Sequence, residues 1–373
     1  MLHYAKVMQA LTDIKGELFT DISKEISIAR ASWQRIANDP EFQKKAHAIS
    51  SPWVVPSWTD AIDKTFDVAP LHEPYQVVSV DGSQIYPDRH QGTSCYLINV
   101  GTIVISYGMQ HQPFVYNSIP YVYAGRNENE ADDNLMDVVN ARRQELELQY
   151  GLDICQPLFN HEVPQTFLFD GSLIFWHLAS KSPNLKDHYI ARYLGLMHQL
   201  YAARILHGGY ISLSKGKDLV NLIRMELCNF LVKGCTEHKV MDHISDSTIA
   251  GFFLKVGQRS IVFKSHSPIC DEYPEHLMPY FFYLHVGDEI ARIEVPAWIA
   301  QDEENVNAVA RIMYDQAQKG NGYPVALAEA HEQAVVKGPD REFFYQMVNK
   351  LAIDFKKRMF ISQKSSKKRV MGI

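Results

Sequence analysis

Two Asp-Gly-Ser triplets, each behind an apolar run, are the feature of the sequence that most suggests chemistry. Asp81 follows QVVSV at 76–80, and Asp170 follows TFLF at 166–169. Each run predicts a buried strand that ends on a carboxylate and is followed by a tight turn. If the two strands are neighbours, both carboxylates lie at one edge of a sheet, where they repel each other and favour a divalent cation. One triplet alone would be ordinary turn chemistry, whereas two indicate a metal site.

Four further side chains are candidates to complete such a site. Glu145 and Glu147 lie on opposite flanks of the apolar stripe of one expected helix, so periodicity does not choose between them, and both could be exposed helix acids. His331 in YPVALAEAH could bind metal or carry a proton, or be an ordinary core or surface histidine. Lys215 ends the expected strand YISLSK, where it could neutralise a scissile phosphate or be a surface lysine.

An acid cluster with a histidine and a lysine suits two-metal phosphodiester hydrolysis. One metal ion lowers the pKa of the attacking water, and the other stabilises the leaving oxygen. Because the candidate ligands are oxygen and imidazole groups, Mg²⁺ or Mn²⁺ is expected. The sequence contains no GxxxxGK[ST] or GxGxxG motif, so no nucleotide-binding loop is predicted. It also lacks HExxH and GxSxG, so neither a metalloprotease nor a serine hydrolase is predicted.

The composition describes a large folded chain without a strongly basic character. Its 373 residues are 46% hydrophobic, enough for one large domain with additions or for two domains. The net charge is −6 and the isoelectric point is about 6.2, so any affinity of the isolated protein for DNA is expected to be weak and steeply lost with salt. Only the C-terminus forms a basic tail, with Lys356, Lys357, Arg358, Lys364, Lys367, Lys368 and Arg369.

The five cysteines and the N-terminus predict a cytoplasmic protein. The cysteines are odd in number and have no Cys-x-x-Cys spacing, which predicts neither a disulfide framework nor a zinc site and favours a reducing compartment. The N-terminus shows no cationic segment followed by an apolar one. No apolar run reaches the ~18 residues that a membrane span needs, so no membrane association is expected.

The expected elements make a mixed sheet with helices on its faces, an α/β fold. Three strands with short connections predict antiparallel pairing, and the next strands are linked by helices, which predicts parallel pairing. The first 48 residues read as helices that form either a separate arm or a cover on the main domain. Strands are expected at 76–81, 93–108, 113–125, 166–170, 209–214, 260–265, 279–286 and 290–296, and helices at 130–150, 188–207, 217–233, 303–318, 323–336 and 340–361.

Five segments in this order resemble the NurA family of DNA-repair nucleases. They are VVSVDGSQIY, FLFDGSLI, the strand ending LSK, YFFYLHVG with IARIEVPAW, and YPVALAEAH, and the resemblance runs from about residue 76 to about 345. It implies a ribonuclease-H-like core in a nuclease domain at 71–345, between a helical N-terminal extension at 1–70 and a C-terminal helix and basic tail at 346–373. It also implies a homodimer.

The activity that the resemblance implies is a Mn²⁺-dependent deoxyribonuclease, with Mg²⁺ as the alternative ion. Such proteins have 5′-to-3′ exonuclease and single-strand endonuclease activity. They act with a HerA-type hexameric ATPase in DNA end resection for double-strand break repair. One rival interpretation is a non-catalytic partner or regulator of a DNA-translocating ATPase. Another is an ATP-binding enzyme of the actin or sugar-kinase type, against which the lack of further Gly-rich phosphate loops counts.

The resemblance also implies roles for single residues. The two motif acids fall on Asp81 and Asp170, the helix glutamate falls on Glu145 or Glu147, and the histidine falls on His331. A functional tyrosine of the family has its nearest match at Tyr280 or Tyr283 in PYFFYLH. The expected metal ligands are Asp81, Asp170, Glu147 and His331, and the expected phosphate contact is Lys215.

Overall fold

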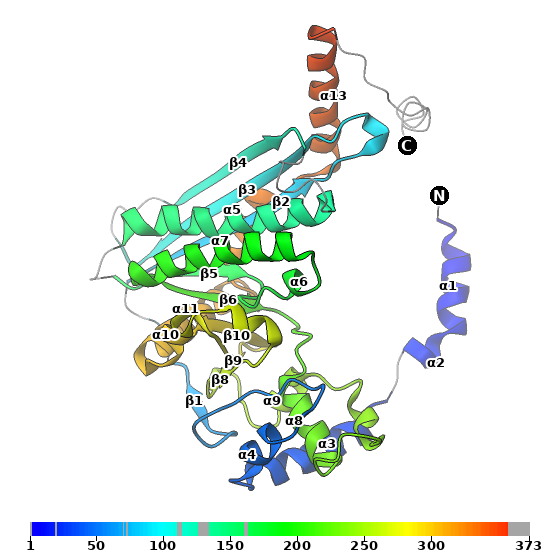
Figure 1. The fold of residues 1–373 in the computed structure, drawn as a ribbon, viewed down its shortest axis with the longest axis vertical. Coiled ribbons are helices and arrows are strands. Elements are labelled where there is room, and N and C mark those ends of the chain that lie inside the picture. Colours follow the sequence, from blue (N-terminus) through cyan, green and yellow to red (C-terminus); the bar gives the residue numbers. More distant parts are fainter. Residues whose placement is uncertain are drawn as a thin grey trace.

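A ten-stranded mixed sheet forms the centre of the computed structural model, which describes residues 2–18, 21–69, 71, 74–109, 114–125, 134–159 and 163–356 (Figure 1). The strand order is β1-β7-β9-β10-β6-β5-β2-β3-β4, and β8 pairs with β9. The strands are β1 (Thr65–Asp67), β2 (Tyr75–Ile85), β3 (Tyr96–Tyr107), β4 (Val115–Tyr123), β5 (Gln165–Asp170), β6 (Leu206–Ile211), β7 (Gln258–Ser260), β8 (Phe263–Lys264), β9 (Pro279–His285) and β10 (Ile290–Pro296).

The pairing confirms the predicted mixed α/β sheet. β3 runs antiparallel to β2 and β4, whereas β5 runs parallel to β2 and β6. The order β4-β3-β2-β5-β6 in this half of the sheet is consistent with a ribonuclease-H-like core. β9 and β10 form the expected hairpin. The strand expected at 260–265 is divided between β7 and β8, because the ladder is interrupted at Ile261 and Val262.

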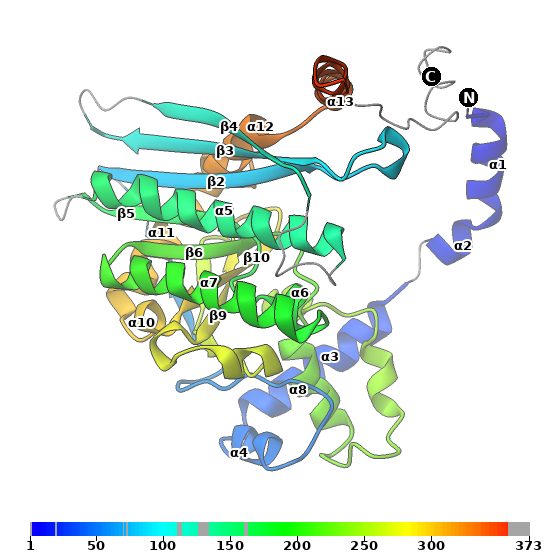
Figure 2. The same cartoon turned by 45° about the horizontal axis from the view of Figure 1, so that its top comes forward.

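Helices cover both faces of the sheet (Figures 1 and 2). On one face lie α5 (Leu135–Leu158), α6 (Trp176–Ala179) and α7 (Pro183–Ala202), and on the other lie α10 (Ala297–Ala300), α11 (Glu303–Lys319) and α12 (Val325–Ala334). Alternate residues of β2 serve the two layers, since Val78 and Val80 pack against the first set and Val77 against the second. The middle of β2 is therefore buried on both faces.

A third apolar cluster joins the N-terminal helices to the segment after β6. α3 (Ser23–Ala37) and α4 (Phe42–His47) pack against α8 (Asp218–Leu227) and α9 (Asp246–Ala250). Trp33 of α3 stacks on Phe253, with ring centroids 5.3 Å apart. By contrast, α1 (Tyr4–Asp13) buries no residue, and with α2 (Lys15–Leu18) it stands apart from the body in both views. The first 48 residues thus contain both an arm and a cover.

The remaining described helices are α13 and four short 3₁₀ turns. α13 is shorter than the helix expected at 340–361, and the basic tail beyond Lys356 lies outside the described residues. None of the described helices combines the length and the apolar character needed to cross a membrane. The bounds are α13 (Gly338–Asp354), η1 (Arg89–Gln91), η3 (Glu237–Met241), η4 (Pro268–Glu272) and η5 (Glu275–Leu277).

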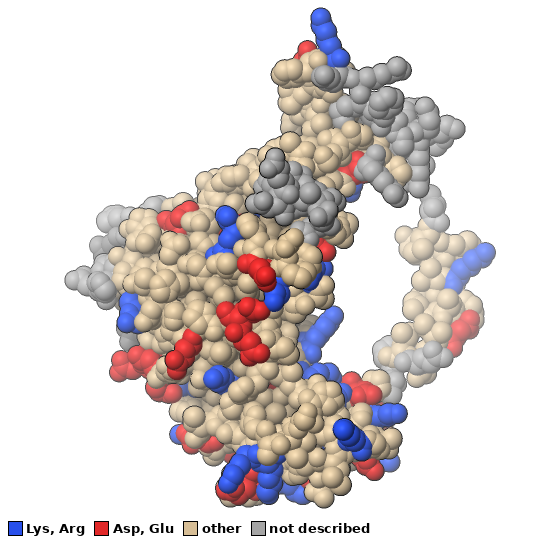
Figure 3. Space-filling view, in the orientation of Figure 1, with Lys and Arg blue, Asp and Glu red and all other residues tan. Residues whose placement is uncertain are grey.

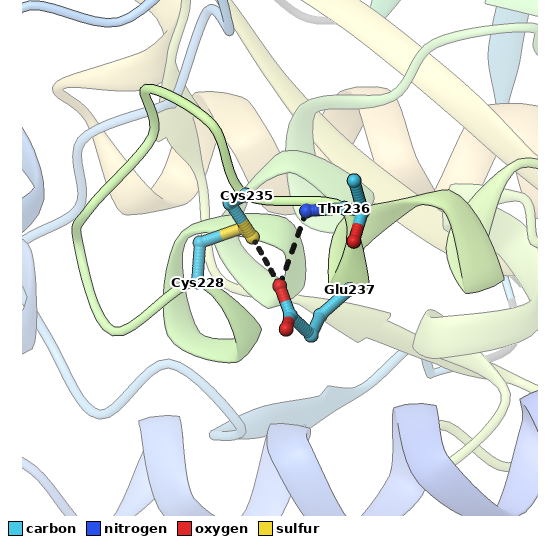
Figure 4. The surroundings of a disulfide bond; sticks show 4 residues. All are labelled: Cys228, Cys235, Thr236 and Glu237. Atoms are coloured by element: carbon cyan, nitrogen blue, oxygen red, sulfur yellow. Dashed lines mark hydrogen bonds between the residues drawn. A yellow bond between two sulfur atoms is a disulfide. The ribbon is translucent and has the colours of Figure 1, made fainter.

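The cysteine pattern predicted no disulfide framework, but one pair of cysteines forms a disulfide bond. Cys228 and Cys235 are bonded, with their Cα atoms 5.8 Å apart (Figure 4). Asn229 and Phe230, both with positive φ, turn the chain directly after α8 and return it toward Cys228. This turn brings the two cysteines together, although they are seven residues apart and do not have Cys-x-x-Cys spacing. The Glu237 carboxylate lies beside the bond and accepts the Thr236 N–H at 3.1 Å.

Candidate metal centre

The two motif aspartates lie on adjacent strands at the same level of the sheet. β2 and β5 are parallel, with Val80 opposite Phe169, so Asp81 and Asp170 come next in register. Asp170 is the last residue of β5, and Gly171 turns the chain with φ +129°. The turn predicted after Asp81 is wrong, because β2 continues to Ile85 against β3. The neighbouring antiparallel strand supplies hydrogen bonds that carry β2 past its carboxylate.

Gly82 of the first triplet is explained by helix packing rather than by a turn. A Cβ atom at Gly82 would lie 2.7 Å from Arg143 Cγ and 2.7 Å from Glu147 Oε1, both on α5. α5 begins where the Asn134 side chain accepts the Met136 N–H at 3.1 Å. The absence of a side chain at Gly82 lets this helix approach β2 closely. As a result, a carboxylate of α5 reaches the edge of the sheet beside the aspartates.

The geometry distinguishes the two helix acids. Glu147 is 4% exposed and accepts a hydrogen bond from Arg143, whose Nη1 also donates to the Gly82 carbonyl at 3.3 Å. Glu145 instead forms an ion pair with Arg192 of α7. Of the two candidates, the structure therefore brings Glu147 to the aspartates and turns Glu145 toward the neighbouring helix.

His331 reaches the site from the opposite face of the sheet. Its Nδ1 lies 2.8 Å from Asp81 Oδ2. α12 can pack this closely because β3 carries a glycine beneath it, and a Cβ at Gly101 would lie 2.3 Å from Ala334 N and 2.4 Å from Ala330 O. The carbonyl of Ala334 also accepts the Asn99 side-chain amide of β3 at 2.8 Å. Gly101 thus fixes the height of His331 above Asp81.

Substitution of Gly101 by alanine tests this positioning. The added methyl group meets helix backbone, which cannot rotate away, so we expect Gly101→Ala to lower the free energy of unfolding by about 1–3 kcal/mol. Urea denaturation measures the change. The matched control is Gly195→Ala at an exposed position of α7, where a Cβ meets nothing within 4 Å and a helical alanine should stabilise slightly. Equal effects of the two substitutions would contradict the close approach of α12.

Tyr323 is a site residue that sequence reasoning missed. Its hydroxyl donates a hydrogen bond to Asp170. Tyr283 is buried and donates to Asp246 Oδ2 at 2.8 Å, and Tyr280 lies on β9 opposite Lys264. The structure therefore brings neither of the expected tyrosines to the aspartates. The available signal was the segment YPVALAEAH itself, which begins with Tyr323, eight residues before His331.

Lys215 is likewise not placed beside the acids. It follows β6 and lines a second cavity with Trp176 and Arg292. The cavity that contains Asp170 and Glu147, of about 490 Å³, is lined on the α5 and α6 side by Asn140, Arg143, Gln144, His177 and Lys181.

Two acids of this site, Glu147 and Asp170, hold protons more tightly than usual. Burial raises the pKa of Glu147 to about 8, and nearby Asp81 and Asp170 act in the same direction against the lowering effect of Arg143. Burial also raises the pKa of Asp170, with a further contribution from Asp81, although the Tyr323 hydrogen bond opposes it. Like charges that cannot all ionise together are the condition that a divalent cation relieves.

The donor set fits a hard divalent cation. Three carboxylates, with one imidazole beside them, suit Mn²⁺ or Mg²⁺. In the described part of the chain their ligand atoms do not all lie within 4.8 Å of one another, so the side chains would draw together around an ion. A set of three within that distance does occur at Cys228, Cys235 and Glu237, but its two sulfur atoms are bonded to each other.

One known protein family matches the part of the chain that contains the candidate metal centre. Residues 75–336, more than half of the sequence, match the model of the NurA domain. The chain belongs to the NurA family. All the residues that form the candidate metal centre fall within this NurA domain, whereas α1 to α4 and α13 fall outside it.

Two solved structures of NurA proteins are similar to this NurA chain. One is a crystal structure of NurA with manganese, with 10% identity and a TM-score of 0.36, covering 86% of this chain and 95% of that one. The other is a crystal structure of NurA bound to dAMP and manganese, with 11% identity and a TM-score of 0.35, covering 82% and 90%. No curated protein matches the chain.

Proposed function

We propose that this NurA-family protein is a Mn²⁺-dependent DNA nuclease whose metal centre is built on Asp81, Asp170 and Glu147. The observation that carries the proposal is the convergence of these three carboxylates from two parallel strands and a helix. A buried acid with a raised pKa, as Glu147 is, is costly for a fold, and a metal site gives it a chemical reason. A non-catalytic partner of an ATPase would need no such cluster.

The residues divide into those that hold metal and those that orient the ligands. Asp81, Asp170 and Glu147 would bind the ion, which when bound lowers the pKa of water and stabilises a leaving oxygen. Tyr323 holds the Asp170 carboxylate by its hydrogen bond. Arg143 holds Glu147 in the same way.

His331 is the proton carrier of this proposal. Because its Nδ1 faces Asp81, the other ring nitrogen is left to exchange a proton with substrate or solvent, and the side chain is 57% exposed. The carboxylate of Asp81 thus orients the imidazole as well as providing a ligand.

Degradation of end-labelled DNA tests the proposed activity. Single- and double-stranded substrates are incubated with Mn²⁺, Mg²⁺ or EDTA. We expect cleavage with Mn²⁺ and none with EDTA. If the wild-type protein cleaves neither substrate with either ion, even with a HerA-type ATPase added, the proposal fails and the non-catalytic partner takes its place.

Family membership supports the finer parts of the proposal. These are 5′-to-3′ exonuclease and single-strand endonuclease activity, action in DNA end resection and double-strand break repair, and partnership with a HerA-type hexameric ATPase. On the face drawn in Figure 3, basic and acidic side chains are intermixed rather than gathered into a broad basic surface. Binding of DNA there would depend on single cations and would weaken steeply with salt.

A homodimer is the quaternary structure that we propose. Apolar side chains are exposed on α1 (Met8, 64%) and on α13 (Leu351, 54%), and such faces favour contact with another protein surface. Light scattering on the full chain measures the mass directly. A mass of 42.7 kDa at micromolar concentration, that of one chain, would contradict the dimer.

A further inference from the structure

A second cavity shares a wall with the metal centre. Ser172, two residues after Asp170, lines both the cavity beside the acids and another of about 450 Å³. We call the latter the Lys215 cavity, and it is lined by Val54, Ser172, Trp176, Ile211, Ser214, Lys215, Gly216, Lys217, Asp218, Asn221, Arg292 and Glu294. A ligand in the Lys215 cavity would therefore lie directly beyond the loop that follows β5.

A buried ion network forms the floor of the Lys215 cavity. Arg292, 2% exposed, donates from Nη1 to Asp218 Oδ2 at 2.7 Å and from Nε to Glu294 Oε1 at 2.8 Å. The second oxygen of Glu294 accepts the Ser172 hydroxyl at 2.7 Å and the Leu173 N–H at 2.9 Å. The network thus ties the loop after Asp170 to the cavity. It also engages both carboxylates of the lining, which leaves them less available to repel an anion.

The cations of the cavity are not equivalent. Three cations and two carboxylates line it, which leaves an excess of one positive charge. Lys217 donates to the backbone carbonyls of Ile244 and Asp242. Lys215 is exposed and has no ion-pair partner among the described residues, so it is the cation available to a ligand. Arg292 Nη2 is buried, also without a hydrogen-bond partner in the described chain.

An exposed aromatic ring lines the same cavity as this lysine. Trp176, the first residue of α6, lines the same cavity and is 45% exposed, a large fraction for tryptophan. Proteins that bind single-stranded nucleic acid without reading its sequence combine cations that contact the phosphate backbone with aromatic faces on which the bases stack. A base inside a duplex is already stacked on its neighbours and would not reach such a ring.

We propose that the Lys215 cavity binds one nucleotide of single-stranded DNA, with its phosphate on Lys215 and its base on Trp176, while the same strand continues across Ser172 to the metal centre. This inference rests on the proposed nuclease function and adds a strand-selecting subsite to it. It also changes the role of Lys215, which contacts a phosphate away from the bond that is cut. The cavity then explains how a protein with an acidic net charge holds its substrate.

Binding of a labelled oligo-dT strand in EDTA, followed by fluorescence anisotropy, tests the subsite without cleavage. We expect Trp176→Leu to weaken binding about tenfold, because one base loses its stacking partner. Lys215→Gln should weaken it about fivefold and reduce the slope of log affinity against log salt by about 0.7, the loss of one phosphate contact. The matched controls are Lys255→Gln and Tyr116→Leu, both exposed and outside the cavity, and these should bind like the wild type.

The outcomes separate the subsite from the nuclease. If both cavity variants bind the strand as the wild type does, the subsite is overturned, whether or not the protein cleaves DNA. If they lose affinity while the wild type cleaves nothing with any metal, the subsite stands and the nuclease fails. Equal losses for a blunt duplex would overturn the preference for single strands. Displacement of the strand from the wild type by inorganic phosphate alone at the same concentration would overturn the nucleotide assignment.

Discussion

Asparagine at position 81 or 170 is expected to lower Mn²⁺-dependent DNA cleavage by about three orders of magnitude, which corresponds to about 4 kcal/mol of transition-state stabilisation. The substitution keeps the size of the side chain and its hydrogen bonds but removes the negative charge. Asp81 and Asp170 occupy equivalent positions on parallel strands, so each loss leaves an ion with one carboxylate fewer at the same edge of the sheet. Steady-state cleavage of end-labelled DNA measures the effect.

The control for these variants lies on the helix that carries Glu147. Asp153→Asn removes an exposed acid of α5 and should leave cleavage unchanged. The Asp81→Asn, Asp170→Asn double variant should be no worse than either single variant, because residues that act as one unit give non-additive losses. Mn²⁺ should raise the melting temperature of the wild type but not of the variants. Cleavage retained in both single variants would remove these aspartates from the chemistry.

Periodicity and turn chemistry predicted the helices and strands well, but they did not predict the structural role of single residues. The repeated triplet correctly predicted that Asp81 and Asp170 lie beside each other on neighbouring strands, because parallel neighbours place equivalent positions together. The turn predicted after Asp81 was wrong. An Asp-Gly pair favours a turn in the sequence pattern, even where a partner strand continues the hydrogen-bond ladder. At Gly82 the requirement comes from α5, a contact between segments about 60 residues apart.

Side-chain direction was the information that the sequence lacked most. Glu145 and Glu147 are equivalent in the helical pattern, and what separates them is that Arg192 of α7 lies beside the first and Gly82 of β2 beside the second. The disulfide is another case, because its closure depends on left-handed backbone at Asn229 rather than on cysteine spacing. Such contacts depend on how distant elements pack, and a local pattern does not encode them.

Glu147→Gln is expected to stabilise the metal-free protein while abolishing its response to metal. Burial raises the pKa of Glu147 from 4.5 to about 8. Between these values the folded protein keeps a proton that the unfolded chain releases, so the free energy of unfolding falls as the pH rises across this window. At about 1.4 kcal/mol for each unit of pKa difference, the loss is on the order of 4 kcal/mol by pH 8. Glutamine does not titrate, so this part of the decline should vanish.

Stabilisation by metal should change with pH in the opposite direction, which makes the prediction specific. A metal ion competes with the proton for Glu147, so Mn²⁺ should stabilise the wild type more at pH 8 than at pH 6. The variant should gain little from Mn²⁺ at either pH, although its glutamine oxygen can still accept from Arg143. Urea denaturation in EDTA and in Mn²⁺ at the two pH values measures all four cases.

Glu145→Gln is the matched control, because it changes the same residue type two positions away on α5. That carboxylate is paired with Arg192 outside the acid cluster, so the variant should keep both the pH dependence and the Mn²⁺ response of the wild type. If Glu147→Gln follows Glu145→Gln in both measurements, Glu147 is not a ligand. If instead it is more stable than the wild type in EDTA at pH 8 and indifferent to Mn²⁺, the instability of the buried acid is the counterpart of its metal affinity. A fold that buries an ionisable side chain in this way is less stable without metal, and the same side chain provides its affinity for the ion.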